Sequence, residues 1–396
     1  FNNNMKTIIL KEKLKEGISV VERVSGKSLN LPILNNILLS VEKNFLNLTA
    51  TDLEIGINWW SLVKTEKEGK IALPSRVLSS FVNFLPNKPI NLEIKDLSLK
   101  IECENYQTLI KGFNSEDFPI IPKISDEEKI TMPSKVFCQN LSSVVDIASY
   151  SSFKPEISGI YFLFQKNLIT MAATDSFRLG EKKLYADFSS SSISKDYSLI
   201  LPQRAAKEII NIFGEKEGDL AICFSPNQVL FETPLSETPH PQIQLISRLI
   251  EGEYPNYQEI IPKKHDTKVT VSASELINQV KLASLFSGKI NEVKLKIDPK
   301  KNQLNLFSQN VDVGEHYGVL NCKVEGKPCE ISFNHKFLLE GLMSMVSKKE
   351  TSGRDGSGKE KDSELVLELT SGDKAGVLRP KNDENYLYLI MPIKTS

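Results

Sequence analysis

The feature that most constrains the fold of this chain is an internal repeat. The phrase Ala50-Thr51-Asp52 returns as Ala173-Thr174-Asp175, at an offset of 123 residues from Asp52 to Asp175. In the same order, Leu73-Pro74-Ser75-Arg76 returns as Leu201-Pro202-Gln203-Arg204, at an offset of 128 residues from Arg76 to Arg204. Self-similarity at a nearly fixed period is the signature of a repeat architecture. The chain is therefore expected to consist of copies of one unit.

A third copy is expected after the first two. Both of these end in similar proline-containing linkers, residues 117–122 and 253–262. Beyond the second linker, helical patterns begin again near Val271 and Phe333, although only Ser308-Gln309-Asn310 stands where the Thr-Asp phrase stood. We expect domains at residues 5–126, 127–262 and 263–396, and we exclude residues 1–4, ahead of Met5, as an expression remnant. Residues 347–363 hold no apolar side chain and are expected to form a mobile loop.

Each copy predicts the same order of elements: strand, helix, strands, helix, strands. Apolar residues at spacings of three and four predict two helices per copy. The first helix is expected to run from Leu10 to Val24, the second to begin with Ser75 as its cap, and the third to run from Ser134 to Ala148. Later helices are expected to begin at residues 201–204, 271–274 and 333–336. Two helices and many short strands per copy favour an α+β fold with helices packed on one face of an antiparallel sheet.

The stretch around the second Thr-Asp phrase predicts a hairpin and a tight turn. The apolar runs 160–164 and 168–171 read as paired strands, with 165–167 as the turn between them. Thr174-Asp175-Ser176 supplies side chains that can bond nearby backbone. Phe177-Arg178-Leu179 then places an aromatic ring, a cation and an aliphatic chain close together. Taken alone, the stretch is an ordinary packed hairpin, but its return elsewhere in the chain favours a function.

Composition excludes several classes of protein. The chain has 396 residues, 40% hydrophobic and 25% charged, with a net charge of −1, which is typical of a soluble globular protein. The start of the chain lacks the apolar core of a signal peptide, and no apolar run is long enough to span a bilayer. Five scattered cysteines without CxxC spacing are expected to be buried thiols in a reducing cytoplasm.

An enzyme would need a clustered acid, base or metal site, and the sequence offers none. Gly26-Lys27-Ser28 resembles the end of a phosphate-binding loop, but Val21 stands where that motif needs glycine. The four histidines lack metal-ligand spacing. Asp52 and Glu54 form an acidic pair that a turn explains more simply.

The expected helices carry a small positive excess. They hold ten lysines and arginines against seven acidic residues, whereas the remainder of the chain is net negative. By itself this bias is the usual solvated helix face, because phosphate binding requires clustered cations.

Four phrases, taken together and in order, resemble the bacterial DNA polymerase III beta subunit family, the processivity sliding clamps. They are Leu31-Pro32-Ile33-Leu34-Asn35-Asn36-Ile37-Leu38-Leu39, Thr51-Asp52-Leu53-Glu54, Ala173-Thr174-Asp175 with Arg178-Leu179, and Leu389-Ile390-Met391-Pro392-Ile393. Each phrase is weak alone, but the ordered set runs from Met5 to about Lys394 and is highly specific.

The resemblance implies a cytoplasmic, non-catalytic protein without cofactor or metal. It implies three clamp domains per chain and a head-to-tail homodimer that closes a ring around double-stranded DNA without sequence preference. It also implies partners that bind through a hydrophobic groove: the DNA polymerase III alpha subunit, the clamp loader and other proteins with a clamp-binding motif. No membrane is involved.

The resemblance carries over a peptide-binding groove between the second and third domains. Its expected residues are Ile157, Thr174, Ser176, Phe177, Arg178, Leu179, Pro255, Ile260, Asn334, Phe337, Leu389, Ile390, Met391, Pro392 and Ile393. Burying roughly 400 Å² of apolar peptide would give about 10 kcal/mol before ordering costs, so micromolar binding is expected.

Two further sets of residues follow from the resemblance. Those expected to face DNA are Arg23, Lys27, Arg76, Lys135, Arg204 and Lys207, a modest basic set that permits sliding. Those expected at the ring seam are Ile110 of one chain and Leu285 and Phe286 of the other, although Leu285-Phe286 can equally be domain core.

The chain departs from the family pattern at two places. After Thr-Asp, where glycine followed by histidine or tyrosine is common in the family, it has Ser176-Phe177, and near the end it has Lys394 where arginine is frequent. Phe177 removes a hydrogen-bonding ring tip, so the preferred peptide can differ. The competing interpretation is a three-repeat adaptor that binds peptides but encircles nothing.

Overall fold

A three-strand meander surrounds each Thr-Asp phrase, and the boundaries of its elements are equivalent in the first and second repeats. In the first repeat it comprises a short 3₁₀ helix and three strands: η1 (Pro32–Asn35), β2 (Asn36–Glu42), β3 (Phe45–Thr51) and β4 (Ile55–Leu62). In the second it comprises η3 (Pro155–Ser158), β11 (Gly159–Gln165), β12 (Leu168–Thr174) and β13 (Arg178–Tyr185). Every boundary is displaced by the offset of 123 residues seen between Asp52 and Asp175. The predicted hairpin of the second repeat is confirmed as β11 and β12.

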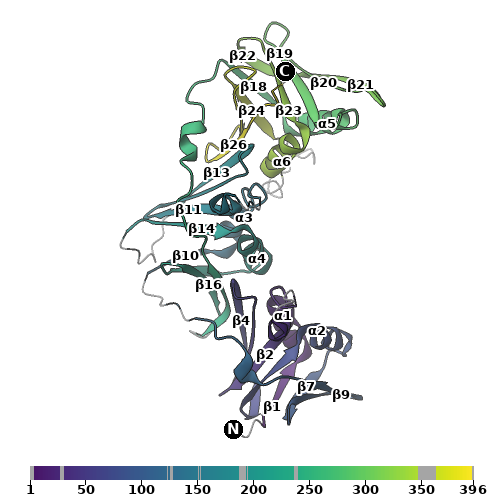
Figure 1. Cartoon of the computed structure of the whole chain (residues 1–396), viewed down its shortest axis with the longest axis vertical. Coiled ribbons are helices and arrows are strands. Elements are labelled where there is room, and N and C mark those ends of the chain that lie inside the picture. Colours follow the sequence, from purple (N-terminus) through teal and green to yellow (C-terminus); the bar gives the residue numbers. More distant parts are fainter. Residues whose placement is uncertain are drawn as a thin grey trace, which may run out of the picture. The chain divides into compact units, whose positions relative to one another are not determined.

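The computed structural model describes residues 4–26, 31–122, 124, 128–149, 151, 153–186, 193, 195–235, 240–346 and 363–394. Lys27 and all of the predicted 347–363 loop except Ser363 lie outside the described residues. The chain divides into two compact units, one holding residues 1–138, 188–195 and 207–249 and the other holding 139–187, 196–206 and 250–396. Figure 1 colours the chain along its sequence.

The first unit contains two antiparallel sheets. A five-stranded sheet has the order β5-β1-β7-β8-β9, and an eight-stranded sheet has the order β10-β15-β16-β17-β4-β3-β2-β6. Besides β2, β3 and β4, the strands of these two sheets are β1 (Lys6–Leu10), β5 (Lys64–Lys67), β6 (Gly69–Pro74), β7 (Pro89–Lys95), β8 (Ser98–Cys103), β9 (Tyr106–Lys111), β10 (Lys129–Pro133), β15 (Asp219–Phe224), β16 (Gln228–Pro234) and β17 (Pro241–Arg248). The pairing of β17 with β4 joins strands of the central repeat to strands of the first repeat in one sheet.

The second unit is built in the same way. A nine-stranded sheet has the order β14-β11-β12-β13-β26-β25-β24-β18-β22, and a four-stranded sheet has the order β21-β20-β19-β23. The remaining strands are β14 (Tyr197–Pro202), β18 (Thr267–Ser272), β19 (Glu292–Asp298), β20 (Gln303–Asn310), β21 (Gly314–Asn321), β22 (Lys323–Gly326), β23 (Cys329–Asn334), β24 (Glu364–Leu369), β25 (Gly376–Pro380) and β26 (Tyr386–Ile390). All five residues of β26 are buried, as expected for a last core strand.

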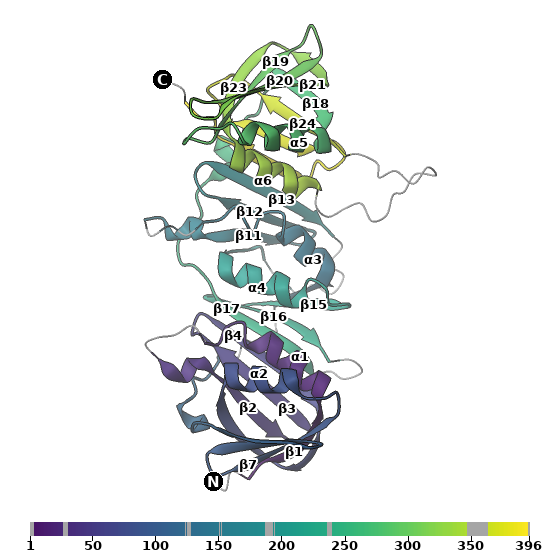
Figure 2. The ribbon, with the colours of Figure 1, turned by 90° about the vertical axis from the view of Figure 1, so that its right-hand side faces the viewer.

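Amphipathic helices cover the sheets, as the sequence predicts. They are α1 (Lys11–Val21), α2 (Ser75–Phe84), α3 (Ser134–Leu141), α4 (Gln203–Phe213), α5 (Ala273–Ser284) and α6 (His335–Val346), with short 3₁₀ turns η2 (Ser115–Asp117) and η4 (Tyr257–Ile260) in the linkers. Figure 2 shows α1 and α2 lying side by side over the strands of the first repeat. Gly17 of α1 lies directly on the ring of Trp59, the largest fully buried side chain. The absence of a side chain at Gly17 therefore lets α1 approach the sheet closely.

Several local predictions are wrong in detail. Ser75 does not cap α2: Pro74 stands at the cap position and has no side-chain acceptor, and Ser75 is the first residue of the helix and is buried. Leu10 ends β1 and is 59% exposed, whereas the expected helix included it. The third helix ends at Leu141, and Val144 and Val145 are buried in the turns that follow.

The cysteine prediction holds only for part of the set. Cys103, Cys138 and Cys223 are buried free thiols, but Cys322 and Cys329 are partly exposed. Burial raises the pKa of the Cys322 thiol to about 11, so this partly exposed thiol stays protonated at neutral pH.

The contact between Gly17 and Trp59 gives a direct test of this packing. Replacing Gly17→Val places a branched side chain inside the indole ring and should lower the free energy of unfolding by about 1–3 kcal/mol. Lys15→Val, an equally β-branched change on the exposed face of the same helix, is the control and should cost well under that. Urea unfolding followed by tryptophan fluorescence measures both. Equal destabilisation by the two changes would contradict the packing.

Candidate functional site

The turn that follows β12 is held by side-chain bonds from two residues. Thr174 Oγ1 donates to the carbonyl of Arg178 (2.7 Å) and accepts from the amide of Ser176 (3.1 Å). Asp175 Oδ1 accepts from the amides of Phe177 (2.9 Å) and Arg178 (3.0 Å). The predicted bonding of this turn to nearby backbone is therefore confirmed. These bonds fix the direction in which the Phe177 side chain leaves the turn.

The same turn is built in the first repeat. Thr51 Oγ1 donates to the carbonyl of Ile55 (2.9 Å), and Asp52 Oδ1 accepts from the amides of Glu54 and Ile55 (3.0 and 2.8 Å). Ser176 and Leu53 both have a φ of 76°, in the left-handed region that L-residues rarely adopt. The threonine and aspartate bonds hold both residues there, which explains why this dipeptide recurs.

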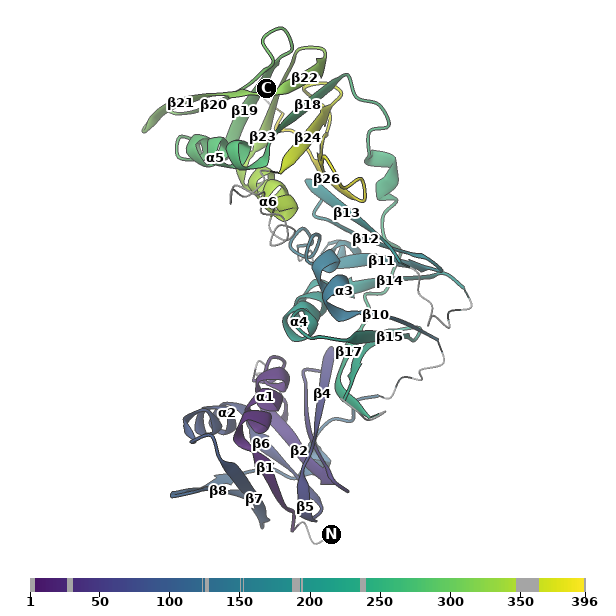
Figure 3. The same cartoon turned by 180° about the vertical axis from the view of Figure 1, so that it is seen from behind.

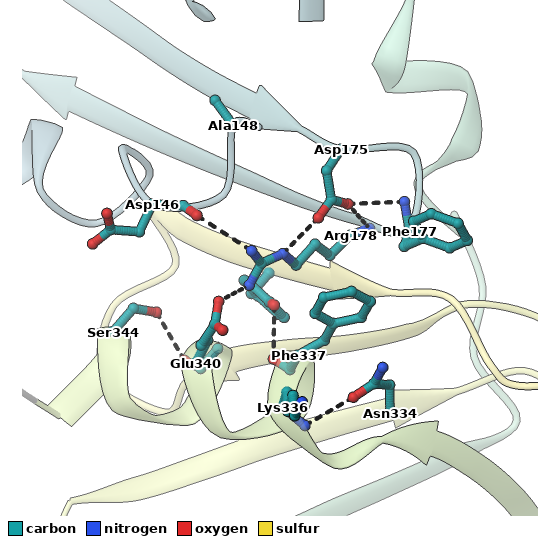
Figure 4. Close-up of polar contacts among 12 residues, drawn as sticks. Asp146, Ala148, Asp175, Phe177, Arg178, Asn334, Lys336, Phe337, Glu340 and Ser344 are labelled. Carbon is teal, nitrogen blue, oxygen red and sulfur yellow. Dashed lines mark hydrogen bonds and ion pairs between the residues drawn. The ribbon is translucent and has the colours of Figure 1, made fainter. Parts of the chain in front are cut away.

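Arg178 is the centre of a buried charge cluster. Its Nε donates to Asp175 Oδ2 (2.9 Å), its Nη2 donates to the carbonyl of Asp146 (3.2 Å), and its Nη1 pairs with Glu340 of α6. The guanidinium carbon also lies 4.7 Å from the ring centroid of Phe337. Figure 4 shows the guanidinium between the two carboxylates, with the Phe337 ring beside it. Arg178 thus joins β13 to the first turns of α6.

The cluster keeps Arg178 charged in a place that water hardly reaches. The side chains of Arg178 and Asp175 are each 8% exposed, whereas that of Glu340 is 52% exposed. Burial alone disfavours the charged guanidinium, but its bonds to Glu340, Tyr388 and Asp175 raise the pKa of Arg178 above its ordinary value. An arginine engaged in this way positions its neighbours, Phe177 and Phe337, whose rings stack with centroids 6.2 Å apart.

Two more charged residues of β13 are buried and paired. Glu181 accepts a hydrogen bond from the hydroxyl of Tyr257 (2.7 Å), which lies in the linker turn η4. Burial and the nearby Glu181 carboxylate raise the pKa of Tyr257, so the hydroxyl keeps its proton and remains the donor. Lys182 forms an ion pair with Asp383 (2.6 Å). Figure 3 shows β13 beside β26, with the linker that carries η4 running past them.

The expected groove residues fall into a buried group and an exposed group. The buried residues are Ile157, Thr174, Arg178, Leu179, Leu389 and Ile390. Those that solvent reaches in part or fully are Ser176, Phe177, Pro255, Ile260, Asn334, Phe337, Met391, Pro392 and Ile393. We call the second group the Phe177 surface. Phe177, Ile260 and Met391 are its most exposed large apolar side chains, at 62, 52 and 40%.

Backbone pairing brings these segments together. In the register of β13 and β26, Arg178 lies opposite Ile390 and Leu179 opposite Leu389. The amide of Met391 donates to the carbonyl of Phe177 (2.8 Å), and the amide of Ile393 donates to that of Ser332 (2.8 Å). Leu179 and Leu389 share one core cluster with Tyr257, on which the linker residues Tyr254 and Ile261 pack. The turn, the linker and the chain end therefore meet, and Phe177 links them to α6.

Sequence reasoning missed the residues that hold this surface in place. It did not single out Glu340 and Asp146, which bond Arg178 of β13. It also missed Glu181, which lies on β13, and Tyr257, which bonds Glu181. A usable signal existed for Glu340, because it follows Phe337 by three residues and so shares a helix face with it. Glu340 lies 162 positions from Arg178, however, so no local pattern links these two residues to each other.

The expected DNA-facing residues lie on or next to helices. Arg23 follows α1, Arg76 lies in α2, Lys135 in α3, and Arg204 and Lys207 in α4. Lys27 lies outside the described residues. Arg23 pairs with Glu208 (3.4 Å), and Lys135 pairs with Glu217. These carboxylates partly offset the positive charge of the helices.

The expected seam residues differ in exposure. Leu285 ends α5 and is 67% exposed, so the alternative that it packs in the domain core is wrong. Phe286 is half-buried and stacks on the His316 ring of β21, with centroids 5.9 Å apart. Ile110 is only 6% exposed, but its neighbour Leu109 on the edge strand β9 is 59% exposed. Any contact made by β9 would therefore involve Leu109 and the strand edge more than the Ile110 side chain.

Two other kinds of site are absent from the part of the chain that the structure describes. Among the residues that the structure describes, no cluster of three histidine, cysteine, aspartate or glutamate side chains is arranged to hold a metal ion. Of the described helices, none has the length and apolar character needed to cross a membrane.

Comparison with known proteins gives a consistent result along the chain. The families for the N-terminal, central and C-terminal domains of the DNA polymerase III beta subunit match residues 5–122, 131–256 and 258–351. A beta sliding clamp from Synechococcus elongatus is 26% identical over 98% of this chain and 99% of its own length. One from Staphylococcus aureus is 26% identical over 92% of this chain and 93% of its own.

A solved structure shares the fold. The DNA polymerase sliding clamp from Bacillus subtilis superimposes with a TM-score of 0.88 at 24% identity, over 99% of this chain and 100% of that one. Three repeats of this architecture define the class of DNA sliding clamps, which are non-catalytic processivity factors. Within that class, the chain belongs to the family of bacterial DNA polymerase III beta subunits.

The Arg178 cluster predicts an asymmetric response to mutation. Arg178→Met leaves the buried Asp175 carboxylate without its cation and should lower the free energy of unfolding by about 3–5 kcal/mol. Glu340→Gln changes a half-exposed partner of the same arginine and should cost less than about 1 kcal/mol. Denaturant unfolding at constant pH measures both. Similar costs for the two variants would show that Arg178 and Asp175 are not a buried pair.

Proposed function

We propose that this sliding clamp acts as a head-to-tail homodimeric ring around double-stranded DNA and tethers its partners through the Phe177 surface. The observation that carries the proposal is the convergence of three distant segments on that surface. The β12–β13 turn supplies Phe177, α6 supplies Phe337, and the chain end supplies Met391. The partners we expect are the DNA polymerase III alpha subunit, the clamp loader and other proteins with a clamp-binding motif, acting in the cytoplasm.

The Phe177 surface suits a short apolar peptide. Exposed aromatic and aliphatic side chains on a monomer mark sites that a partner covers. The cation of Arg178 is already engaged by two carboxylates, so apolar contact rather than a salt bridge would provide the affinity. The stacked rings of Phe177 and Phe337 offer a flat apolar face without a hydroxyl, which favours a peptide that presents an aliphatic or aromatic residue there.

Ring closure would use edge strands with exposed apolar side chains. On β9, Tyr106 and Leu109 are 52 and 59% exposed, and on β21, Tyr317 and Val319 are 66 and 43% exposed. Both strands end their sheets and offer unpaired backbone groups. A contact between unlike surfaces forms a closed ring when the rotation between copies closes. The paired cations Arg23 and Lys135 would then attract DNA weakly, which suits sliding.

Ring formation is tested by mass and by topology. Light scattering should give twice the chain mass, and loaded protein should stay on circular duplex DNA but leave a linearised duplex. Leu285→Arg should give monomers that are retained on neither, since it places a charge on an exposed apolar contact. Leu62→Arg, at a comparably exposed leucine of β4, is the control and should remain dimeric. A wild-type monomer, or equal retention on both DNA forms, would favour the adaptor that encircles nothing.

Peptide binding is tested at the tip of the turn. A clamp-binding peptide of the polymerase should bind with a dissociation constant in the micromolar range, and Phe177→Ala should weaken it by about tenfold or more. Phe177 is 62% exposed, so its loss should leave stability unchanged. Glu54→Ala alters the residue at the same turn position of the first repeat and is the matched control. An unchanged affinity for Phe177→Ala would move the peptide site elsewhere.

A further inference from the structure

The first unit contains a cavity that no part of the proposed function uses. It has a volume of about 670 Å³ and lies between the linker that follows β9 and the faces of β2, β3, β4 and β17. Asn47, Thr49, Asn58 and Gln244 give it a polar wall, and the rings of Trp60 and His240 lie at the same wall. Its volume is within the range of ligand sites, roughly 300–1,000 Å³.

The corresponding space in the second unit is filled by the chain itself. The offset of 123 residues relates Thr49 to Ala172 and Asn58 to Glu181. Strand pairing supports this match, because Gln244 lies opposite Asn58 and Leu387 lies opposite Glu181. In the second unit, Ala172 and Leu387 pack against Tyr257, whose hydroxyl donates to Glu181 (2.7 Å).

The ring of a second tyrosine completes this filling. Tyr254 stacks on Tyr161 with centroids 5.2 Å apart, and Tyr257 meets the same ring edge-on at 6.2 Å. Tyr161 corresponds by the same offset to Leu38, which lines the cavity of the first unit. Tyr254 has a counterpart in the first linker, because buried Phe118 stands at the same position before the proline and lines the cavity. The ring of Tyr257 is therefore the one that the first unit lacks.

The difference comes from the length of the two linkers. The second linker runs from Pro255 through Asn256-Tyr257-Gln258-Glu259 to Ile260-Ile261-Pro262, whereas the first passes directly from Pro119 to Ile120-Ile121-Pro122. The four additional residues form most of η4 and carry Tyr257. In the first linker, Ile121 packs against Leu230 and Ile246 and lies beside Gly56, where a Cβ would lie 2.8 Å from Ile121 Cδ1. Ile120 is 93% exposed. The sequence of the first linker, residues 117–122, has no counterpart of Tyr257.

We propose that this cavity is a second docking site, which accepts a tyrosine side chain of a peptide segment from a partner protein. The guest is inferred from Tyr257, which fills the equivalent space in the second unit. Asn58 Oδ1 accepts from Thr49 Oγ1 (2.7 Å), and the amide group of Asn58 has N–H donors for a guest hydroxyl. Aromatic side chains bury roughly 150–250 Å² each, enough to anchor a short peptide. The proposal is independent of the Phe177 surface, because every lining residue belongs to the first unit.

The first test uses a synthetic peptide with the sequence of residues 254–260, capped at both ends, as the probe. Isothermal titration should give saturable binding of one probe per chain. A probe with alanine at the position of Tyr257 should bind about tenfold more weakly or worse, and one with phenylalanine should lie between the two. Gln244→Trp fills the cavity from β17 and should abolish binding, while Gln303→Trp on β20 should not. Equal binding by the tyrosine and alanine probes, or by Gln244→Trp and the wild type, overturns the proposal.

The second test does not depend on tolerance of a bulky substitution. Insertion of Asn-Tyr-Gln-Glu between Pro119 and Ile120 gives the first linker the turn that it lacks. The inserted tyrosine should occupy the cavity, so probe binding should be lost, and the same insertion with alanine for tyrosine should retain it. Circular dichroism establishes that both variants are folded. Retained binding by the folded tyrosine insertion, or no binding by the wild type at millimolar probe, contradicts the assignment.

Discussion

The pairing of strands between neighbouring repeats is the constraint on which the remaining structure depends. β4 pairs with β17 in the first unit, and β13 pairs with β26 in the second, so the larger sheet of each unit is shared between two repeats. The amide of Arg248 donates to the carbonyl of Glu54 (2.9 Å), and the amide of Met391 donates to that of Phe177 (2.8 Å). These two bonds are equivalent in the two units. They attach the last strand of the following repeat, β17 or β26, to the tip of each Thr-Asp turn and so determine which residues lie beside that turn.

On this shared backbone arrangement, the side chains around the Thr-Asp turn differ between the two units. In the second unit the turn carries Phe177, and the buried Arg178 joins it to α6 through Asp175 and Glu340. In the first unit the equivalent positions of Phe177 and Arg178 are Glu54 and Ile55, so the same backbone presents a charge and an aliphatic core residue. The same architecture thus presents the apolar Phe177 surface in the second unit and a polar cavity in the first. The repeated strands give both units the same backbone geometry, whereas residue substitutions and the length of the linker make the two sites different.

The sequence predicts what is local and repeated. The β11–β12 hairpin and the threonine and aspartate bonds of the turn follow from residues within a few positions of one another. The pairing of Arg178 with Glu340 joins segments 162 residues apart, so no spacing rule relates the two residues, although Glu340 shares a helix face with Phe337. The prediction that Ser75 caps α2 is wrong because the helix begins at Ser75 itself, one residue earlier than a Ser75 cap requires, with Pro74 at the cap position. The exposure of Leu285 also required the structure, since its helical spacing fits a core residue equally well.

Hydrogen exchange on the peptide-bound clamp shows whether the strand pairing in the second unit presents the docking surface. A clamp-binding peptide should slow exchange at the amides of residues 176–179 and 389–391 and of Ile393, and should leave residues 53–56 of the equivalent first turn unchanged. Slowed exchange at both turns, or at neither, would contradict this role of the strand pairing. The first outcome would mean that the repeated backbone alone binds peptides, and the second that the Phe177 surface does not bind them.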